Sequence, residues 1–132
     1  MKLAHFALLI DDYDKAIDYY TNVLGFTLLE DTQLDEQKRW VRVAPSGNTE
    51  TSILLAKASN EQQLSRIGNQ TGGRVFLFLH TDNFQEFYDR LLQHQVKIIR
   101  PITHEAWGTV CVFEDTYGNL WDLIQPATNG NA

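Results

Sequence analysis

The segment LLIDDYDKAIDYY at Leu8–Tyr20 returns as LHTDNFQEFYDRL at Leu79–Leu91, 71 positions further along the chain. In each copy an apolar stretch leads into polar residues and then into apolar residues at helical spacing. A repeated unit of this length rarely buries its own apolar face, and it packs against a neighbour instead. The same offset pairs Val41 with Val112, Gly47 with Gly118 and Asn48 with Asn119. The chain is therefore expected to contain two similar modules.

The composition is that of an ordinary globular protein. Of the 132 residues, 43% are apolar and 21% are charged, which suffices for one compact domain with a core. The net charge of −6 argues against nucleic-acid binding, which needs a basic surface. The sequence shows neither a membrane-spanning run nor a secretory pattern, and its single Cys111 cannot form an internal disulfide. We therefore expect a cytoplasmic protein without nucleic-acid or membrane partners.

The first half predicts the order strand, helix, strand, strand, strand. Leu3–Ile10 is an apolar strand, Asp11 or Asp12 is the N-cap of a helix, and Gly25 follows the helix C-terminus. The remaining features expected in this half are strands at Phe26–Glu30, Arg39–Ala44 and Ser52–Ala56, a hairpin tip at Thr32–Lys38 and a turn at Pro45–Asn48.

The second half repeats this order after a short helix at Glu61–Ile67. Its helix is expected at Asn83–His94, where Gln95 replaces the glycine that ends the first helix. Its strands are expected at Arg74–His80, Val96–Ile99, Thr109–Glu114 and Leu120–Ile124. We expect a single domain over residues 1–132, with a first module at about 1–58, a linker at about 59–73, a second module at about 74–126 and a tail at 127–132.

Three stretches carry a resemblance to a known superfamily: LAHFALLIDDYDKAIDYYTNVLGF at Leu3–Phe26, VFLFLHTDNFQEFYDRL at Val75–Leu91 and VFEDTYGNLWDLIQP at Val112–Pro126. Over almost the whole chain the sequence resembles the vicinal oxygen chelate superfamily, which includes glyoxalase I, extradiol dioxygenases and bleomycin-resistance proteins. The resemblance implies an α+β fold in which two βαβββ modules form curved mixed sheets around a cleft. It also implies a homodimer. Small members often exchange modules between the two subunits.

The resemblance also implies where a metal ion would bind. Members with a metal take one ligand early in the first strand and one in the last strand of each module. Here these positions hold His5 in the first module and Asp122 in the second. The repeat makes Phe76 the counterpart of His5, and a turn three residues longer makes Leu54 the counterpart of Asp122. Phe and Leu cannot coordinate a metal. Two alternatives therefore stay open: the protein binds a divalent ion (Ni, Zn, Fe or Mn), or it has no cofactor.

Further residues are candidates for ligand contacts. Phe76, Phe78 and His80 share one strand parity and could face the cleft, whereas Trp107 lies on a loop of the kind that covers a cleft. Arg39 is a candidate for binding a carboxylate or phosphate, and Arg42 has the opposite parity, so at most one of them faces the cleft. The structural alternatives are a hydrogen-bonded core position for His5, a solvent-facing Asp122 and surface positions for the other polar residues.

Two functional hypotheses follow. The first is a glyoxalase/dioxygenase-like small-molecule enzyme of lyase, isomerase or oxidoreductase type. In it His5 and Asp122 would act as incomplete metal ligands or as an acid/base pair. The alternative is a metal-free protein that binds and sequesters a small molecule, as bleomycin-resistance proteins do.

Overall fold

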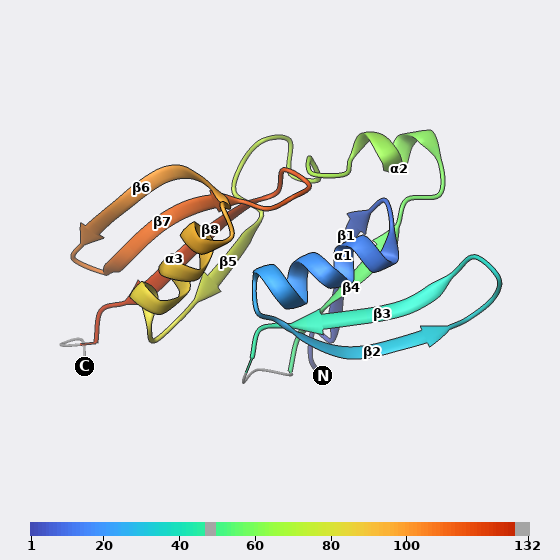
Figure 1. Ribbon diagram of the computed structural model, residues 1–132, viewed down its shortest axis with the longest axis horizontal. Helices are drawn as coiled ribbons and strands as arrows, with labels where there is room; N and C mark the ends of the chain where they lie inside the picture. The colour runs from blue at the N-terminus through green and yellow to red at the C-terminus, as the bar shows by residue number, and fades with distance from the viewer. Residues whose placement is uncertain (47–49, 129–132) are drawn as a thin grey trace. The chain divides into compact units, whose positions relative to one another are not determined.

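The chain forms two compact units, residues 1–67 and 68–132, in a computed structural model that describes residues 1–46 and 50–128. Each unit contains a four-stranded mixed sheet built in the predicted βαβββ order (Figure 1). The predicted turn residues Gly47 and Asn48 and the end of the tail, residues 129–132, lie outside the described residues. The α+β fold class with two βαβββ modules is confirmed.

Unit 1 has the strand order β1-β4-β3-β2, in which β1 and β4 are parallel and the other neighbours are antiparallel. Asp12 is the N-cap of its first helix, because its side chain accepts a hydrogen bond from the backbone N–H of Lys15 at 2.9 Å. Its elements are β1 (His5–Ile10), α1 (Tyr13–Asp18), the π-helical turn η1 (Tyr19–Val23), β2 (Thr27–Gln33), β3 (Arg39–Ala44), β4 (Ser52–Lys57) and α2 (Glu61–Ser65).

Unit 2 repeats the arrangement with the strand order β5-β8-β7-β6, in which β5 and β8 are parallel. Asn83 caps its helix in the same way, through a bond from the backbone N–H of Glu86. Its elements are β5 (Leu77–His80), α3 (Phe84–Gln93), β6 (Lys97–Glu105), β7 (Gly108–Glu114) and β8 (Leu120–Pro126).

One face of each sheet packs against the helix of its own unit (Figure 1). In unit 1 the Arg39 side chain pairs with Asp14 of α1 and lies over the Tyr13 ring, which places the odd-numbered β3 side chains on the α1 side. In unit 2 Phe113 packs against Phe87 of α3 and stacks on Trp121. We call the opposite face of each sheet its distal face. The buried helix-facing strand residues are Leu8, Ile10, Val41, Val43, Ile53 and Leu55 in unit 1, and Leu77, Leu79, Cys111, Phe113, Trp121 and Leu123 in unit 2.

The two modules differ by one residue at the end of the helix. In unit 1 the N–H of Phe26 bonds to the carbonyl of Tyr20, and in unit 2 the N–H of Val96 bonds to that of Leu91. The connection in unit 1 is therefore one residue longer. The extra residue lies in the π-helical turn η1, where the N–H of Leu24 donates to the carbonyl of Tyr19, five residues earlier. The offset between the modules therefore falls from 71 before this turn to 70 after it.

The strand register corrects one pairing expected from the constant offset. Arg42 pairs with Leu54, and Val112 pairs with Asp122. Val112 is therefore equivalent to Arg42 rather than to Val41, because the extra residue of η1 shifts the register by one. The proposed equivalence of Leu54 and Asp122 is confirmed by the same pairings.

The strand boundaries differ most from expectation in β6. The strand was expected to end at Ile99, whereas it continues to Glu105, which pairs with Gly108 across a tight turn. Pro101 is tolerated because β6 is an edge strand, where a missing N–H need not break a ladder bond. Similarly β2 extends to Gln33, and β5 begins only at Leu77. Among the described residues, no helix combines the length and apolar character needed to cross a membrane.

Candidate functional site

The distal face of unit 1 carries a continuous polar network. Its centre is Ser52, whose Oγ lies 2.9 Å from Nδ1 of His5 and accepts a hydrogen bond from Arg42 Nη1 at 3.2 Å. Arg42 also donates from Nε to Glu30 Oε1 at 2.9 Å. The network thus joins four strands, because His5 lies on β1, Ser52 on β4, Arg42 on β3 and Glu30 on β2.

Glu30 anchors this network and also orients an aromatic ring. The hydrogen bond from Arg42 is the largest of the effects that lower the pKa of the Glu30 carboxyl, and hydrogen bonds from Thr32 and Trp40 add to it. The Trp40 ring meets the His5 ring edge-on, with 5.9 Å between centroids and an interplanar angle of 77°. Trp40 and His5 therefore stand beside the Arg42 guanidinium on one surface.

Arg39, the arginine selected from the sequence, does not share this face. Its guanidinium lies over the Tyr13 ring at 5.1 Å and forms ion pairs with Asp14 of α1 and Asp31 of β2. Both carboxylates raise the pKa of Arg39 above its ordinary value, Asp31 most strongly. Arg42, with the opposite strand parity, is the arginine that reaches His5 and Ser52.

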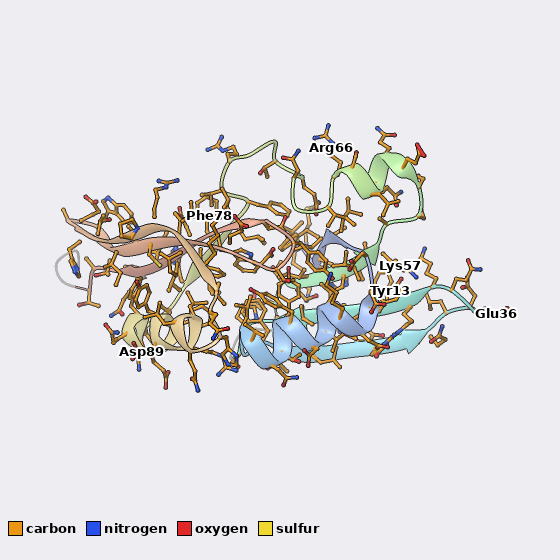
Figure 2. All side chains as sticks on the ribbon, turned by 45° about the horizontal axis from the view of Figure 1, so that its top comes forward. Tyr13, Glu36, Lys57, Arg66, Phe78 and Asp89 are labelled. Carbon is orange, nitrogen blue, oxygen red and sulfur yellow. The ribbon has the colours of Figure 1, made fainter. Side chains whose placement is uncertain are left out.

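The distal face of unit 2 combines an exposed aromatic ring with a carboxyl group. Phe78 on β5 is 61% exposed and pairs with Asp122 on β8. The same row of the sheet continues from Asp122 to Val112 on β7 and then to Arg100 on β6. Figure 2 shows Phe78 on the side of the sheet away from α3. Burial raises the pKa of the Asp122 carboxyl, and the Arg100 cation partly opposes this rise.

The other sequence candidates of unit 2 occupy separate places. His80 lies two residues from Phe78 on β5 and is exposed. Phe76 precedes β5 and donates its backbone N–H to the carbonyl of Leu120 at 2.9 Å. Trp107 is exposed at the turn between β6 and β7, whereas the sequence placed it on a longer loop. Cys111 is buried in the core of unit 2.

The four positions that would supply metal ligands do not hold a suitable donor set. His5 and Asp122 belong to different units, and their counterparts Phe76 and Leu54 carry hydrocarbon side chains without donor atoms. Within residues 1–46 and 50–128, no three His, Cys, Asp or Glu side chains group closely enough to hold a metal ion. The residues present therefore do not fit a divalent metal centre of three or four protein ligands.

Sequence reasoning missed two members of the unit 1 network. Glu30 was expected only as the last residue of a strand, and Ser52 only as the first. Strand alternation places Ser52 on the same face as Leu54, and it could have identified both residues once the register was known. The register between β1 and β4 joins segments 47 residues apart, so local pattern alone could not supply it.

Comparisons with known proteins agree on one family. The sequence profile of the Glyoxalase/Bleomycin resistance protein/Dioxygenase superfamily matches residues 2–123. An uncharacterized protein of Shewanella frigidimarina is 54% identical over 124 residues, covering 93% of this chain and 92% of that protein. The lactoylglutathione lyase of Salmonella typhimurium is 29% identical over 133 residues, covering 98% and 96%. TnmS3, an antibiotic binding protein from Streptomyces sp. CB03234, matches with a TM-score of 0.75 and 29% identity, covering 96% and 97%.

Proposed function

The chain belongs to the glyoxalase/bleomycin resistance protein/dioxygenase superfamily, and on this premise we propose that it binds a small organic molecule on the distal faces of its two units without a metal ion. The observation that carries the proposal is the pair Phe76 and Leu54 at two of the four ligand positions. Hydrocarbon side chains there favour contact with an apolar ligand over coordination of a cation.

The exposed aromatic residue of unit 2 supports the same function. Phe78 lies beside Phe76, and a large apolar side chain exposed within a sheet face is typical of a ligand-binding surface. TnmS3, of similar length and 29% identity, binds an antibiotic. Both features support a ligand with a planar or apolar body.

A second candidate function is catalysis of the glyoxalase-like type, which the similarity to lactoylglutathione lyases supports. The raised pKa of Asp122 favours proton transfer, because a carboxyl that protonates nearer neutral pH exchanges protons more readily with a substrate. In this candidate His5 and Asp122 form an acid/base pair acting on a carbon acid next to a carbonyl.

Calorimetric titration with 2-naphthol, a neutral planar probe, tests the binding function. We expect binding to survive dialysis against EDTA and to weaken roughly tenfold in Phe78→Ala, since a buried aromatic contact contributes about 1–2 kcal/mol. Leu92→Ala is the matched control, because Leu92 is also exposed but lies on α3. Loss of binding in EDTA, or equal affinities of both variants and the wild type, would overturn the proposal.

The proposal also includes the assembly and location expected from the sequence. A single domain formed by both units, a homodimer and a cytoplasmic location are parts of it. Light scattering coupled to size-exclusion chromatography should give twice the chain mass of 15.2 kDa. A monomeric mass at micromolar concentration would contradict the dimer while leaving ligand binding to be judged by titration.

A further inference from the structure

The hydrogen atoms of the unit 1 network can be assigned from its donors and acceptors. Ser52 is 1% exposed, so its hydroxyl hydrogen needs a protein acceptor. Arg42 only donates, so Ser52 Oγ is the acceptor of that contact. Among the described residues, the remaining partner of the hydroxyl is Nδ1 of His5, at 2.9 Å. A hydrogen on Nδ1 would leave the buried hydroxyl of Ser52 without an acceptor.

The tautomer of His5 follows from this assignment. Nδ1 accepts from Ser52, so neutral His5 carries its hydrogen on Nε2. His5 is exposed, and its Nε2–H is available as a hydrogen-bond donor to a ligand. A general base acting through Nε2 would need the opposite tautomer.

The guanidinium of Arg42 adds further donors beside His5. Of its five N–H groups, Nε–H donates to Glu30 and one Nη1–H donates to Ser52. In the part of the chain that the structure describes, the Nη2 amino group has no partner. The side chain is 22% exposed, so it is held in place by Glu30 and still reached by solvent. Arg42 and His5 thus both present donors, and Trp40 stands beside them as a flat apolar surface.

We propose that His5 Nε2–H and Arg42 Nη2 bind an oxygen anion carried on a planar conjugated frame, such as an aromatic carboxylate, with the frame against Trp40. This assignment rests on the proposed function and names the ligand class of that surface. A carboxylate accepts several hydrogen bonds and matches donors from a cation and an imidazole. Glu30 contacts the guanidinium through one bond, from Nε, and so leaves the Nη2 amino group to a ligand.

The tautomer is measured first, on the ligand-free protein, by long-range ¹H–¹⁵N correlation spectra of the histidine rings at alkaline pH, where imidazole is neutral. We expect His5 to show a hydrogen on Nε2 and an unprotonated Nδ1. In Ser52→Ala we expect His5 to populate both tautomers, because Nδ1 has lost its donor. The melting temperature of this variant shows whether it is folded. A wild-type His5 protonated on Nδ1 would overturn the assignment, whatever the protein binds.

Ligand class is measured with a matched pair of probes, 2-naphthoate and the neutral 2-naphthamide. We expect 2-naphthoate to bind more tightly, to shift the His5 and Trp40 ring resonances, and to lose roughly tenfold or more in affinity in Arg42→Gln. Arg39→Gln is the control, because Arg39 lies on the same strand at nearly equal side-chain exposure, 20% against 22%, but faces α1. In that variant the affinity should stay within about twofold of the wild type.

The outcomes separate the inference from the proposed function. Equal affinity for both probes, or equal losses in the two arginine variants, would overturn the anion assignment while the binding function stands. If neither naphthalene probe binds at millimolar concentration, binding of planar ligands fails as well. Tighter binding of 2-naphthoate that responds only to Arg42→Gln supports both.

Discussion

Leu54 and Asp122 occupy the same register position in the two sheets. Leu54 pairs with Ala7 on one side and Arg42 on the other, and Asp122 pairs with Phe78 and Val112 in the same way. Ala7 thus corresponds to Phe78, Leu54 to Asp122 and Arg42 to Val112, so a small or apolar residue in one module corresponds to a large or charged residue in the other. The two distal faces have diverged in opposite ways on one scaffold, unit 1 as a polar network and unit 2 as an aromatic surface with one carboxyl group.

Asp122→Asn should stabilise the protein at neutral pH. Burial raises the pKa of Asp122, so ionisation is less favourable in the folded than in the unfolded state. The protonated Asp122 carboxyl contributes stability that is present below its unfolded pKa of 3.8. This contribution is lost as the pH rises through the higher pKa of the folded state. We expect the variant to melt about 1–3 °C higher than the wild type at pH 7. At pH 3 the difference should vanish, and a wild type more stable at pH 7 would contradict the prediction.

Gly68→Ala should destabilise the protein far more than Gly72→Ala. Both glycines have left-handed backbones, with φ of 75° and 72°. A Cβ atom on Gly68 would lie 1.8 Å from the backbone oxygen of Tyr117, whereas one on Gly72 would meet nothing within 4 Å. We expect a loss of about 3 kcal/mol or more for Gly68→Ala and about 1 kcal/mol for Gly72→Ala in urea unfolding. Equal losses would show that the backbone conformation alone matters.

Asp115 should be essential to the turn between β7 and β8. Its carboxylate is 3% exposed and accepts bonds from the backbone N–H groups of Tyr117 and Asn119 and from the indole N–H of Trp121, at 2.9–3.0 Å. Asp115→Ala leaves these buried donors without an acceptor, and we expect it to cost about 3–5 kcal/mol. Asp115→Asn keeps one acceptor oxygen and should lose less. If both variants unfold at the wild-type urea concentration, the turn does not depend on this carboxylate.

Gln95→Gly should stabilise the second helix end. Gln95 has a φ of 60° and occupies the position that Gly25, with a φ of 76°, holds in the first module. A residue with a side chain in this left-handed conformation is destabilised by about 1–2 kcal/mol. Replacing it with glycine removes this strain, but glycine loses more conformational entropy on folding, which offsets part of the gain. The net gain expected is about 0.5–1 kcal/mol, measured as a higher urea midpoint. Gly25→Gln is the reciprocal variant and should lose a similar amount, and a destabilised Gln95→Gly would contradict the argument.

Cys111 should be unreactive in the folded protein. Burial raises the pKa of its thiol from 9.0 to about 11, and the nearby Asp122 carboxylate adds to the rise. At pH 8 we expect iodoacetamide to label the folded protein at least 100-fold more slowly than the urea-unfolded chain, since the thiolate fraction and access both fall. The thiol also contributes stability that is present below pH 9 and is lost as the pH rises towards 11. Labelling at equal rates in both states would place Cys111 at the surface.

The order of strands and helices could be predicted from local pattern, because each signal lies within a few residues. Asp12 and Asn83 cap helices through bonds to backbone N–H groups three residues ahead, and Gly25 ends the first helix in a left-handed conformation. The β6 strand was predicted to end at Ile99, whereas it continues through Pro101 to Glu105, and proline is tolerated in a sheet mainly on an edge strand. Only the strand order shows that β6 is an edge strand.

Local patterns in the amino-acid sequence sufficed for the repeated βαβββ order, for the first helix N-cap at Asp11 or Asp12, and for placing His5 in the first strand and Asp122 in the last. The folded structure was needed to show that Arg42 rather than Arg39 joins His5, through Ser52. Successive strand residues alternate between faces, so the single extra residue of η1 is enough to change which side chain meets which across the sheet. Hydrogen bonds between strands 47 residues apart then complete the network, and no local pattern encodes such a pairing.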